Sequence, residues 1–151
     1  MQPRKRNLKK KGFRKMKYFI SSKWRNRDKV LELTEKLRGK GQFVYCFFES
    51  NANIRSSEGD PELEMQEFES IPNWQADKRI YAIFKDVVSK IKDSDILILL
   101  LPSGNSAHIE AGIAYGLGKK CILVGEKKEA ESMYLVFDKF YNSIDEFVKS
   151  V

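Results

Sequence analysis

Apolar residues occur along the chain in two patterns, short continuous runs and helical spacing, and these patterns predict the secondary structure. Continuous runs predict strands over residues 17–22 (KYFISS), 42–48 (QFVYCFF), 94–101 (SDILILLL) and 119–126 (KKCILVGE). A fifth, short strand is expected at the end of MYLVFDKFYNS. Apolar runs of this kind are typical of a parallel sheet that is covered on both faces.

Helical spacing fills the intervals between the predicted strands. After the first strand, the apolar face consists of Val30, Leu33 and Leu37. A longer helix over about 76–92 has an apolar stripe of Ile80, Ile83, Phe84, Val87 and Ile91. Ser143 and Glu146 form a capping-box pattern that predicts a last helix over IDEFVKSV.

Because strands and helices alternate, the sequence predicts an α/β fold, a flavodoxin/Rossmann-like three-layer sandwich. Its five-stranded sheet is expected to be mostly parallel, with the strand order 2-1-3-4-5 and the apolar third strand at the centre. Ligands bind such sheets beyond the carboxyl ends of the strands, at the point where the strand order reverses. The loops expected there are SSKWRN and PSGNSAHIE.

The composition fits one soluble globular domain, with 151 residues, 42% apolar and 32% charged. The longest apolar run, 96–101, is too short to span a bilayer, and no signal peptide is visible, so we expect a cytoplasmic protein without membrane contact. The polar segment 49–75 is long for a connection and is interpreted as functional or mobile. A lid over the site is one such function, and the sequence does not decide it.

Cysteine and histidine are scarce in this chain. Cys46 and Cys121 lie in apolar, strand-like contexts, and we interpret them as buried reduced thiols, with a disulfide as the alternative. With one histidine and two cysteines, none closely spaced, no metal site is expected. We expect no cofactor.

The net charge of +7 belongs to the N-terminus. Residues 1–17 hold nine lysines and arginines and no acid, and the rest of the chain has 19 basic and 21 acidic residues. Residues 1–16 are therefore interpreted as a basic, flexible tail preceding a domain over 17–151. The tail is either a solubilising extension, the reading we favour, or an arm that contacts nucleic acid.

Candidate chemistry gathers at the expected strand ends. Glu110 follows the third strand on a helix rich in alanine and glycine, where it is either a solvated acid or the functional group of the loop. Glycines inside that helix predict a close approach to the sheet or to another helix. Asp86 belongs to the helix before the third strand, where a solvent-facing acid is the alternative.

Two loops complete the predicted site. After the first strand, the candidates are Ser21, Ser22 and Arg25, whose guanidinium suits a phosphate or is simply exposed. After the third strand, the candidate anion-binding or sugar-binding residues are Ser103, Gly104, Asn105 and Ser106. Asn105 or Ser106 is alternatively a plain helix cap. Phe19, Phe47 and Trp74 are candidates for stacking on a base, although the two phenylalanines also suit a core.

Four segments of residues 17–150 resemble the nucleoside 2-deoxyribosyltransferase-like superfamily, and in particular an uncharacterised branch of it. They are KYFISSKWRN, GKGQFVYCF, FKDVVSKIKDSDILILLLPSGNSAHIEAGIAYGLGKKCIL and FYNSIDEF. The string LPSGNSAHIEAGIAYGLGK is the most specific of these. The resemblance excludes the basic tail.

The resemblance implies a glycosyl transfer in which Glu110 is the nucleophile that displaces the base from a nucleoside or nucleotide. Asp86 matches an acid that positions the substrate or protonates the leaving base, and the loop 103–106 matches a sugar or 5′-phosphate site. Phe19 occupies a position where the transferases have a tyrosine. A neighbouring subunit often completes the site in the family, which implies a homodimer.

One departure weakens the implied transfer reaction. The transferases have an aspartate in the loop before the glutamate, and PSGNSAH has no acid. Hydrolysis of the sugar–base bond is therefore better supported than transfer to a second base. The alternatives are a non-catalytic nucleotide-binding or sensing domain, and a protein that contacts nucleic acid through its tail.

Overall fold

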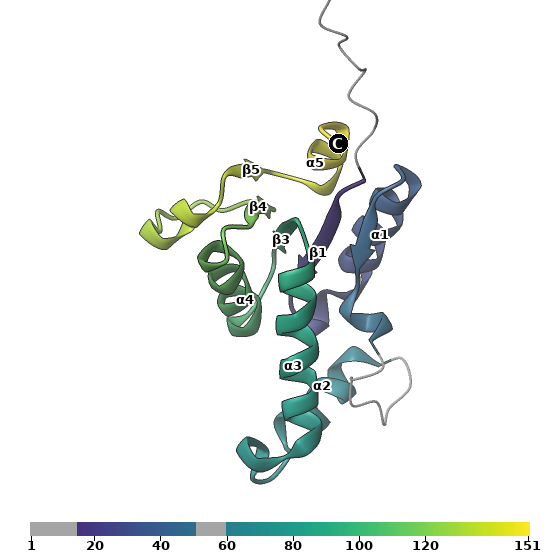
Figure 1. Ribbon diagram of the computed structural model, residues 1–151, viewed down its shortest axis with the longest axis vertical. Coiled ribbons are helices and arrows are strands. Elements are labelled where there is room, and N and C mark those ends of the chain that lie inside the picture. Colours follow the sequence, from purple (N-terminus) through teal and green to yellow (C-terminus); the bar gives the residue numbers. More distant parts are fainter. Residues whose placement is uncertain (1–14, 51–59) are drawn as a thin grey trace, which may run out of the picture.

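The computed structural model describes residues 15–50 and 60–151, and its strands form one parallel sheet (Figure 1). The strands are β1 (Lys17–Ser21), β2 (Phe43–Tyr45), β3 (Ile96–Leu100), β4 (Lys120–Val124) and β5 (Lys139–Tyr141). Their order, β2-β1-β3-β4-β5, and the parallel pairing of all neighbours confirm the predicted topology. The predicted tail lies outside the described residues except for its last two positions.

The helices are α1 (Arg27–Gly39), α2 (Pro61–Glu69), α3 (Lys78–Asp93), α4 (Asn105–Gly116) and α5 (Ile144–Lys149). Short 3-10 turns are η1 (Trp24–Asn26), η2 (Phe47–Glu49), η3 (Trp74–Ala76) and η4 (Ser132–Val136). Helices α1 to α4 lie between successive strands, η4 lies between β4 and β5, and α5 follows the last strand. The predicted cap of the last helix is confirmed, since the Ser143 hydroxyl accepts the Glu146 N–H at 3.1 Å. None of these described helices is long and apolar enough to cross a membrane.

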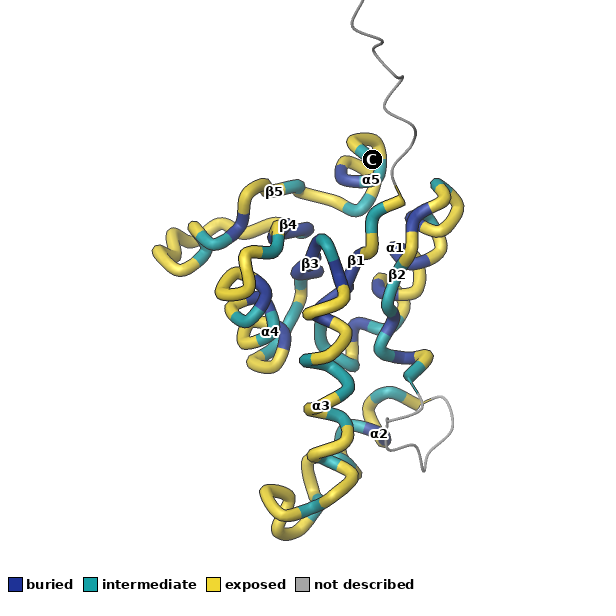
Figure 2. The backbone as a smooth tube through the Cα atoms, viewed as in Figure 1, coloured by how far each residue is buried: buried dark blue, intermediate teal, exposed yellow. Residues whose placement is uncertain are grey.

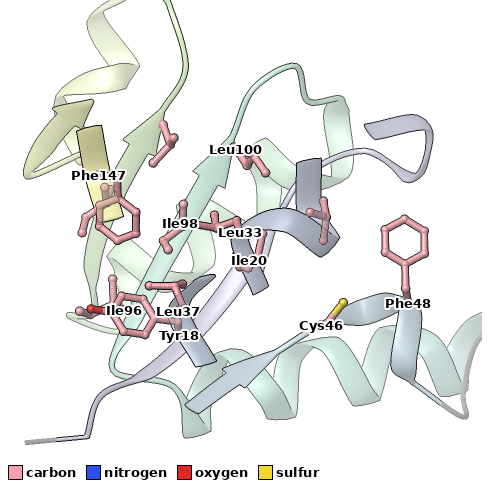
Figure 3. Close-up of a cluster of buried hydrophobic side chains, with 13 residues drawn as sticks. Tyr18, Ile20, Leu33, Leu37, Cys46, Phe48, Ile96, Ile98, Leu100 and Phe147 are labelled. Atoms are coloured by element: carbon pink, nitrogen blue, oxygen red, sulfur yellow. The ribbon is translucent and has the colours of Figure 1, made fainter. Parts of the chain in front are cut away.

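Alternating residues of each strand pack on opposite faces of the sheet, which produces two separate cores. Tyr18 and Ile20 of β1 face α1 and α5, and Figure 3 shows this first core. Phe19 and Ser21 have the opposite parity, and Phe19 packs in the second core with α3 and α4. The two buried cysteines are free thiols, as expected. This parity decides which strand-end side chains can reach α3 and α4.

Two apolar segments differ in the structure from what their sequence patterns indicate. The second strand is shorter than 42–48, because the chain turns after Cys46, whose carbonyl accepts the N–H of Glu49 at 3.0 Å. Phe84 belongs to the predicted apolar stripe of this helix, yet it is 58% exposed. Figures 1 and 2 show the reason: the first half of α3 projects beyond the sheet, so only Ile91, near the end of the helix, is fully buried.

The polar segment 49–75 contains a helix that the sequence analysis did not predict. Residues 51–59 of it lie outside the described residues. Asp60 caps α2 by accepting the N–H groups of Glu62 and Leu63, and Pro61 occupies the first helical turn. An aspartate cap followed by proline is a common way for a helix to begin, but the apolar face of α2 is too short to be recognised in the sequence.

Candidate active site at the strand ends

Helix α4 lies close to the sheet because its inner face consists of alanines. Ala107, Ala111 and Ala114 are fully buried and pack in the same core as Phe19. Glu110 lies on the second turn, between these contacts, and is partly buried. The small side chains therefore bring a carboxylate against the strand ends.

The glycines of α4 do not explain this packing. A methyl group built on Gly112 or Gly116 would meet no other atom within 4 Å. The close approach to the sheet that the small residues predict is present, but alanines provide it and Gly112 and Gly116 do not. The prediction of a side-chain cap is wrong, because the N-cap is Gly104 and no side chain caps the helix.

Ser21 contacts Glu110 directly. The serine is the last residue of β1, is fully buried, and has the strand parity that faces α4. Its hydroxyl donates a hydrogen bond to the Glu110 carboxylate, and the Ala107 carbonyl lies 3.3 Å from the same hydroxyl oxygen. The structure thus brings together two of the residues predicted from the sequence.

Burial sets the acidity of this carboxylate. Removal from water raises the pKa of Glu110 to about 7, and the hydrogen bond from Ser21 opposes part of the rise. Both protonation states are therefore populated near neutral pH. A glutamate with this property at a strand end is a candidate for a reactive group.

Asp86 is held by two hydroxyl groups that the sequence analysis did not select. Tyr45 donates to Asp86 Oδ2 at 3.0 Å, and Ser50 donates to the same oxygen at 2.8 Å. Tyr45 is the last residue of β2 and Ser50 directly follows η2, whereas Asp86 is on α3. The alternative of a purely solvent-facing acid is not what the structure shows.

Tyr45 connects Asp86 with the residues around Glu110. It pairs with Phe19 in the parallel register, and the two rings are stacked with centroids 5.0 Å apart. Burial raises the pKa of Tyr45, and the charges of Asp86 and Glu110 add to the effect. The strand pairing was the available signal for Tyr45, because it places this residue beside Phe19 on the α3–α4 side.

Ser22 points away from Glu110 and joins two strands. Its hydroxyl donates to the Leu100 carbonyl at 2.8 Å, with the Pro102 carbonyl at 3.2 Å, and it accepts from the Asn26 amide at 3.0 Å. These contacts fasten the end of β1 to the end of β3. The hydroxyl of Ser22 therefore stabilises the loop geometry in this structure.

The guanidinium of Arg25 binds two carboxylates of α2. It contacts Glu62 at 2.5 Å and Glu69 at 3.5 Å, and all three side chains are substantially exposed. Next to it, the Trp24 indole donates to the buried Glu64 at 2.7 Å. The loop after β1 thus holds α2 in place, and Arg25 is occupied by protein carboxylates.

The loop 103–106 borders a separate hollow. Ser103 lines an open cavity of about 760 Å³ that also includes His108 and Tyr134. The Ser103 hydroxyl oxygen is buried and makes no hydrogen bond within the part of the chain that the structure describes. Asn105 and Ser106 are exposed on the first turn of α4. None of these four loop residues contacts Glu110 through a hydrogen bond between described residues.

Within residues 15–50 and 60–151, no cluster of three or more His, Cys, Asp or Glu side chains could hold a metal ion. Two polar clusters lie on this side of the sheet: the Glu110 carboxylate with the hydroxyl of Ser21, and the Asp86 carboxylate with the hydroxyls of Tyr45 and Ser50.

Solved structures with the same fold support the resemblance found in the sequence. No protein-family model and no curated protein sequence matches the chain. A CMP N-glycosidase from Clostridium botulinum is similar in structure, with a TM-score of 0.51 and 20% identity over 89% of this chain and 96% of that chain. A 2-deoxyribosyltransferase from Bacillus psychrosaccharolyticus has a TM-score of 0.60 and 19% identity over 87% and 90% of the two chains.

A third structure has no stated activity. A conserved protein from Enterococcus faecalis V583 has a TM-score of 0.57 and 14% identity over 90% of this chain and 96% of its own. The three matches cover 87–90% of this chain and 90–96% of the other chains. The chain therefore shares its fold with these three structures, among them a CMP N-glycosidase and a 2-deoxyribosyltransferase.

Proposed function

We propose that this protein cleaves the N-glycosidic bond of a nucleoside or nucleotide, with Glu110 as the nucleophile. The observation that carries the proposal is the partly buried carboxylate of Glu110, which lies at the strand ends and accepts a hydrogen bond from Ser21. Two structures with this fold, a CMP N-glycosidase and a 2-deoxyribosyltransferase, act on sugar–base bonds and support the assignment.

The proposed reaction uses the ionised carboxylate. A Glu110 oxygen attacks the anomeric carbon of the sugar, the bond to the base nitrogen breaks, and its electron pair leaves with the base. The resulting ester is then hydrolysed by water: its hydroxyl goes to the anomeric carbon, its proton goes to the departed base, and the carboxylate is restored. Asp86 contacts the sugar or base in the same site. Since PSGNSAH contains no acid, water is the favoured acceptor over a second base.

Base release is the direct test of this proposal. Wild type is incubated with nucleosides and nucleoside 5′-monophosphates, and free base is separated and quantified. We expect release by wild type and a loss of at least about a thousandfold in Glu110→Ala and Glu110→Gln. Glu129→Ala removes an exposed carboxylate on the segment after β4 and should leave the rate unchanged.

The panel also separates the proposed enzyme from a sensor. Release from one substrate class that disappears in both Glu110 variants supports the nucleophile. Ligand binding without release by folded wild type would contradict the enzyme and identify a nucleotide-binding domain instead.

We also propose that two copies of the chain pair through α3 and α4. These adjacent helices expose large apolar side chains, among them Phe84 and Ile109, at 58% and 64%. Phe84 and Val88 line a surface groove of about 590 Å³. Apolar surface of this kind is typical of a protein interface, and a second copy agrees with the dimer that the sequence resemblance implies.

Sedimentation velocity tests the pairing. We expect a dimer for wild type and a monomer for Phe84→Glu, with unchanged circular dichroism. Leu135→Glu, which changes an 83% exposed leucine on η4, should remain dimeric. A monomeric wild type at micromolar concentration would overturn this interface.

A further inference from the structure

Tyr45 is a partly buried tyrosine whose hydroxyl the reaction proposed above does not use. Its hydroxyl reaches across from β2 to α3 and donates to Oδ2 of Asp86 at 3.0 Å. Ser50 donates to the same oxygen at 2.8 Å. One carboxylate oxygen of Asp86 is therefore occupied by two hydroxyl groups of the same segment.

The ring of Tyr45 is itself fixed in place. It stacks on Phe19 with centroids 5.0 Å apart and an interplanar angle of 20°. Phe19 is fully buried between the sheet and the helices, and the strands pair Phe19 with Tyr45 directly. A ring held by strand pairing and stacking presents its hydroxyl at one position with little loss of entropy on binding.

The consequence falls on the other oxygen of Asp86. Oδ1 accepts no hydrogen bond from any residue that the structure describes. A carboxylate on a helix surface normally samples several rotamers, whereas two donors on Oδ2 restrict this one. Among the described residues, Asp86 is thus held with one oxygen paired and the other open to a further partner. Pre-set orientation of this kind is a large part of binding and catalysis.

We propose that Tyr45 is the positioning residue of Asp86, holding Oδ2 so that Oδ1 meets the nucleoside substrate. The proposal rests on the glycosidase function described above. Tyr45 acts only through Asp86 and touches no reacting atom. Ser50 is the second donor to the same oxygen, and Phe19 stacks on the tyrosine ring and holds it in place.

A double-mutant cycle tests the coupling between the two residues. The variants are Tyr45→Phe, which keeps the stacked ring, Asp86→Ala, and the pair. The ligand is the nucleoside or nucleotide from which wild type releases base. Its affinity is measured by calorimetry in a Glu110→Gln background, which prevents turnover. The value of kcat/KM is measured with Glu110 intact. Tyr18→Phe is the matched control, since Tyr18 is a buried tyrosine of β1 on the opposite face of the sheet.

We expect Tyr45→Phe to weaken affinity or kcat/KM by about tenfold, as for loss of a hydrogen bond to a charged group. In the Asp86→Ala background the same change should cost less than about twofold, because the acceptor is gone. Tyr18→Phe should change neither quantity. A melting temperature within a few degrees of wild type shows that the fold is kept.

The outcomes distinguish this inference from the proposed function. If wild type releases base and Tyr45→Phe has the same effect with and without Asp86, the positioning role is overturned while the glycosidase stands. An absence of effect in Tyr45→Phe has the same meaning. If wild type neither binds nor cleaves any member of the panel, the proposed function fails, and the role of Tyr45 fails with it.

Discussion

The hydroxyl of Ser21 donates a hydrogen bond to the carboxylate of Glu110, and this contact joins the end of β1 to the second turn of α4. Both groups lie on the face of the sheet that α4 covers with alanines. The hydrogen bond favours the ionised carboxylate, whereas burial favours the protonated one. The balance between the two determines how Glu110 responds to pH.

Ser21→Ala should shift the pH dependence of base release upward. The serine hydrogen bond lowers the pKa of Glu110, so its loss raises that pKa above about 7 and reduces the ionised fraction at neutral pH. We expect the rate at pH 7 to fall by about threefold and to recover at higher pH. Profiles from pH 5 to 9 check this, with Ser22→Ala as the control because Ser22 contacts main-chain carbonyls instead. A uniform loss at all pH values would contradict the assignment.

Glu110 should also make the fold less stable as pH rises. Its pKa is raised from 4.5 to about 7, so the folded state binds the proton more tightly than the unfolded state. The resulting stabilisation is complete below pH 4.5 and is lost as pH rises through 7. This amounts to about 3 kcal/mol of unfolding free energy.

Urea unfolding of wild type and Glu110→Gln at pH 5 and pH 8 measures that effect. Glutamine remains neutral, so the difference in stability between the two proteins should change in favour of the variant at pH 8. Equal differences at both pH values would show that Glu110 is not held in a desolvated position.

The attachment of α2 should depend more on Trp24 than on Arg25. The indole N–H donates to Glu64, which is only 5% exposed, whereas the ion pairs of Arg25 are exposed. Trp24→Phe keeps an aromatic ring and should lower the unfolding free energy by about 2 kcal/mol. Arg25→Met should cause a smaller loss. Hydrogen exchange of the α2 amides should rise in Trp24→Phe, and a larger effect of Arg25→Met would reverse this ranking.

Gly125→Ala should disturb the end of β4. Gly125 has a φ of 129°, and a β-carbon there would lie 2.6 Å from Cβ of Leu101. We expect a loss of about 2 kcal/mol or more in unfolding free energy, from strain and crowding together. Gly39→Ala, where a β-carbon meets nothing within 4 Å, should change stability by less than about 1 kcal/mol. Similar losses for both variants would rule out crowding at Leu101 as the cause.

The sheet could be predicted from the sequence because its strands are nearly continuous apolar runs. The run over residues 96–100 is fully buried and central, and strand order followed from the position of that run. The exposure of Phe84 could not be predicted in the same way. Helical periodicity identifies an apolar face but not the length of helix that the sheet covers, and α3 is longer than its contact with the sheet.

The site was only partly predictable for a similar reason. Glu110, Asp86 and Ser21 follow from motif position and from strand ends, and the structure links each of them to a specific partner. The ion pairs of Arg25 with Glu62 and Glu69 could not be predicted, because the apolar periodicity of α2 is too weak to predict that helix. Tyr45 was hidden because its importance comes from strand pairing with Phe19, which is a relationship between distant segments.

The three alanines of α4 place a selective constraint on side-chain volume. The reach of Glu110 to Ser21 depends on a layer thickness set by the methyl groups of Ala107, Ala111 and Ala114. A valine at any of them would still suit an apolar core, yet it would lift the helix and separate the two polar groups. We therefore expect larger residues at these positions to be selected against because they separate the Glu110 carboxylate from Ser21, even where the protein still folds.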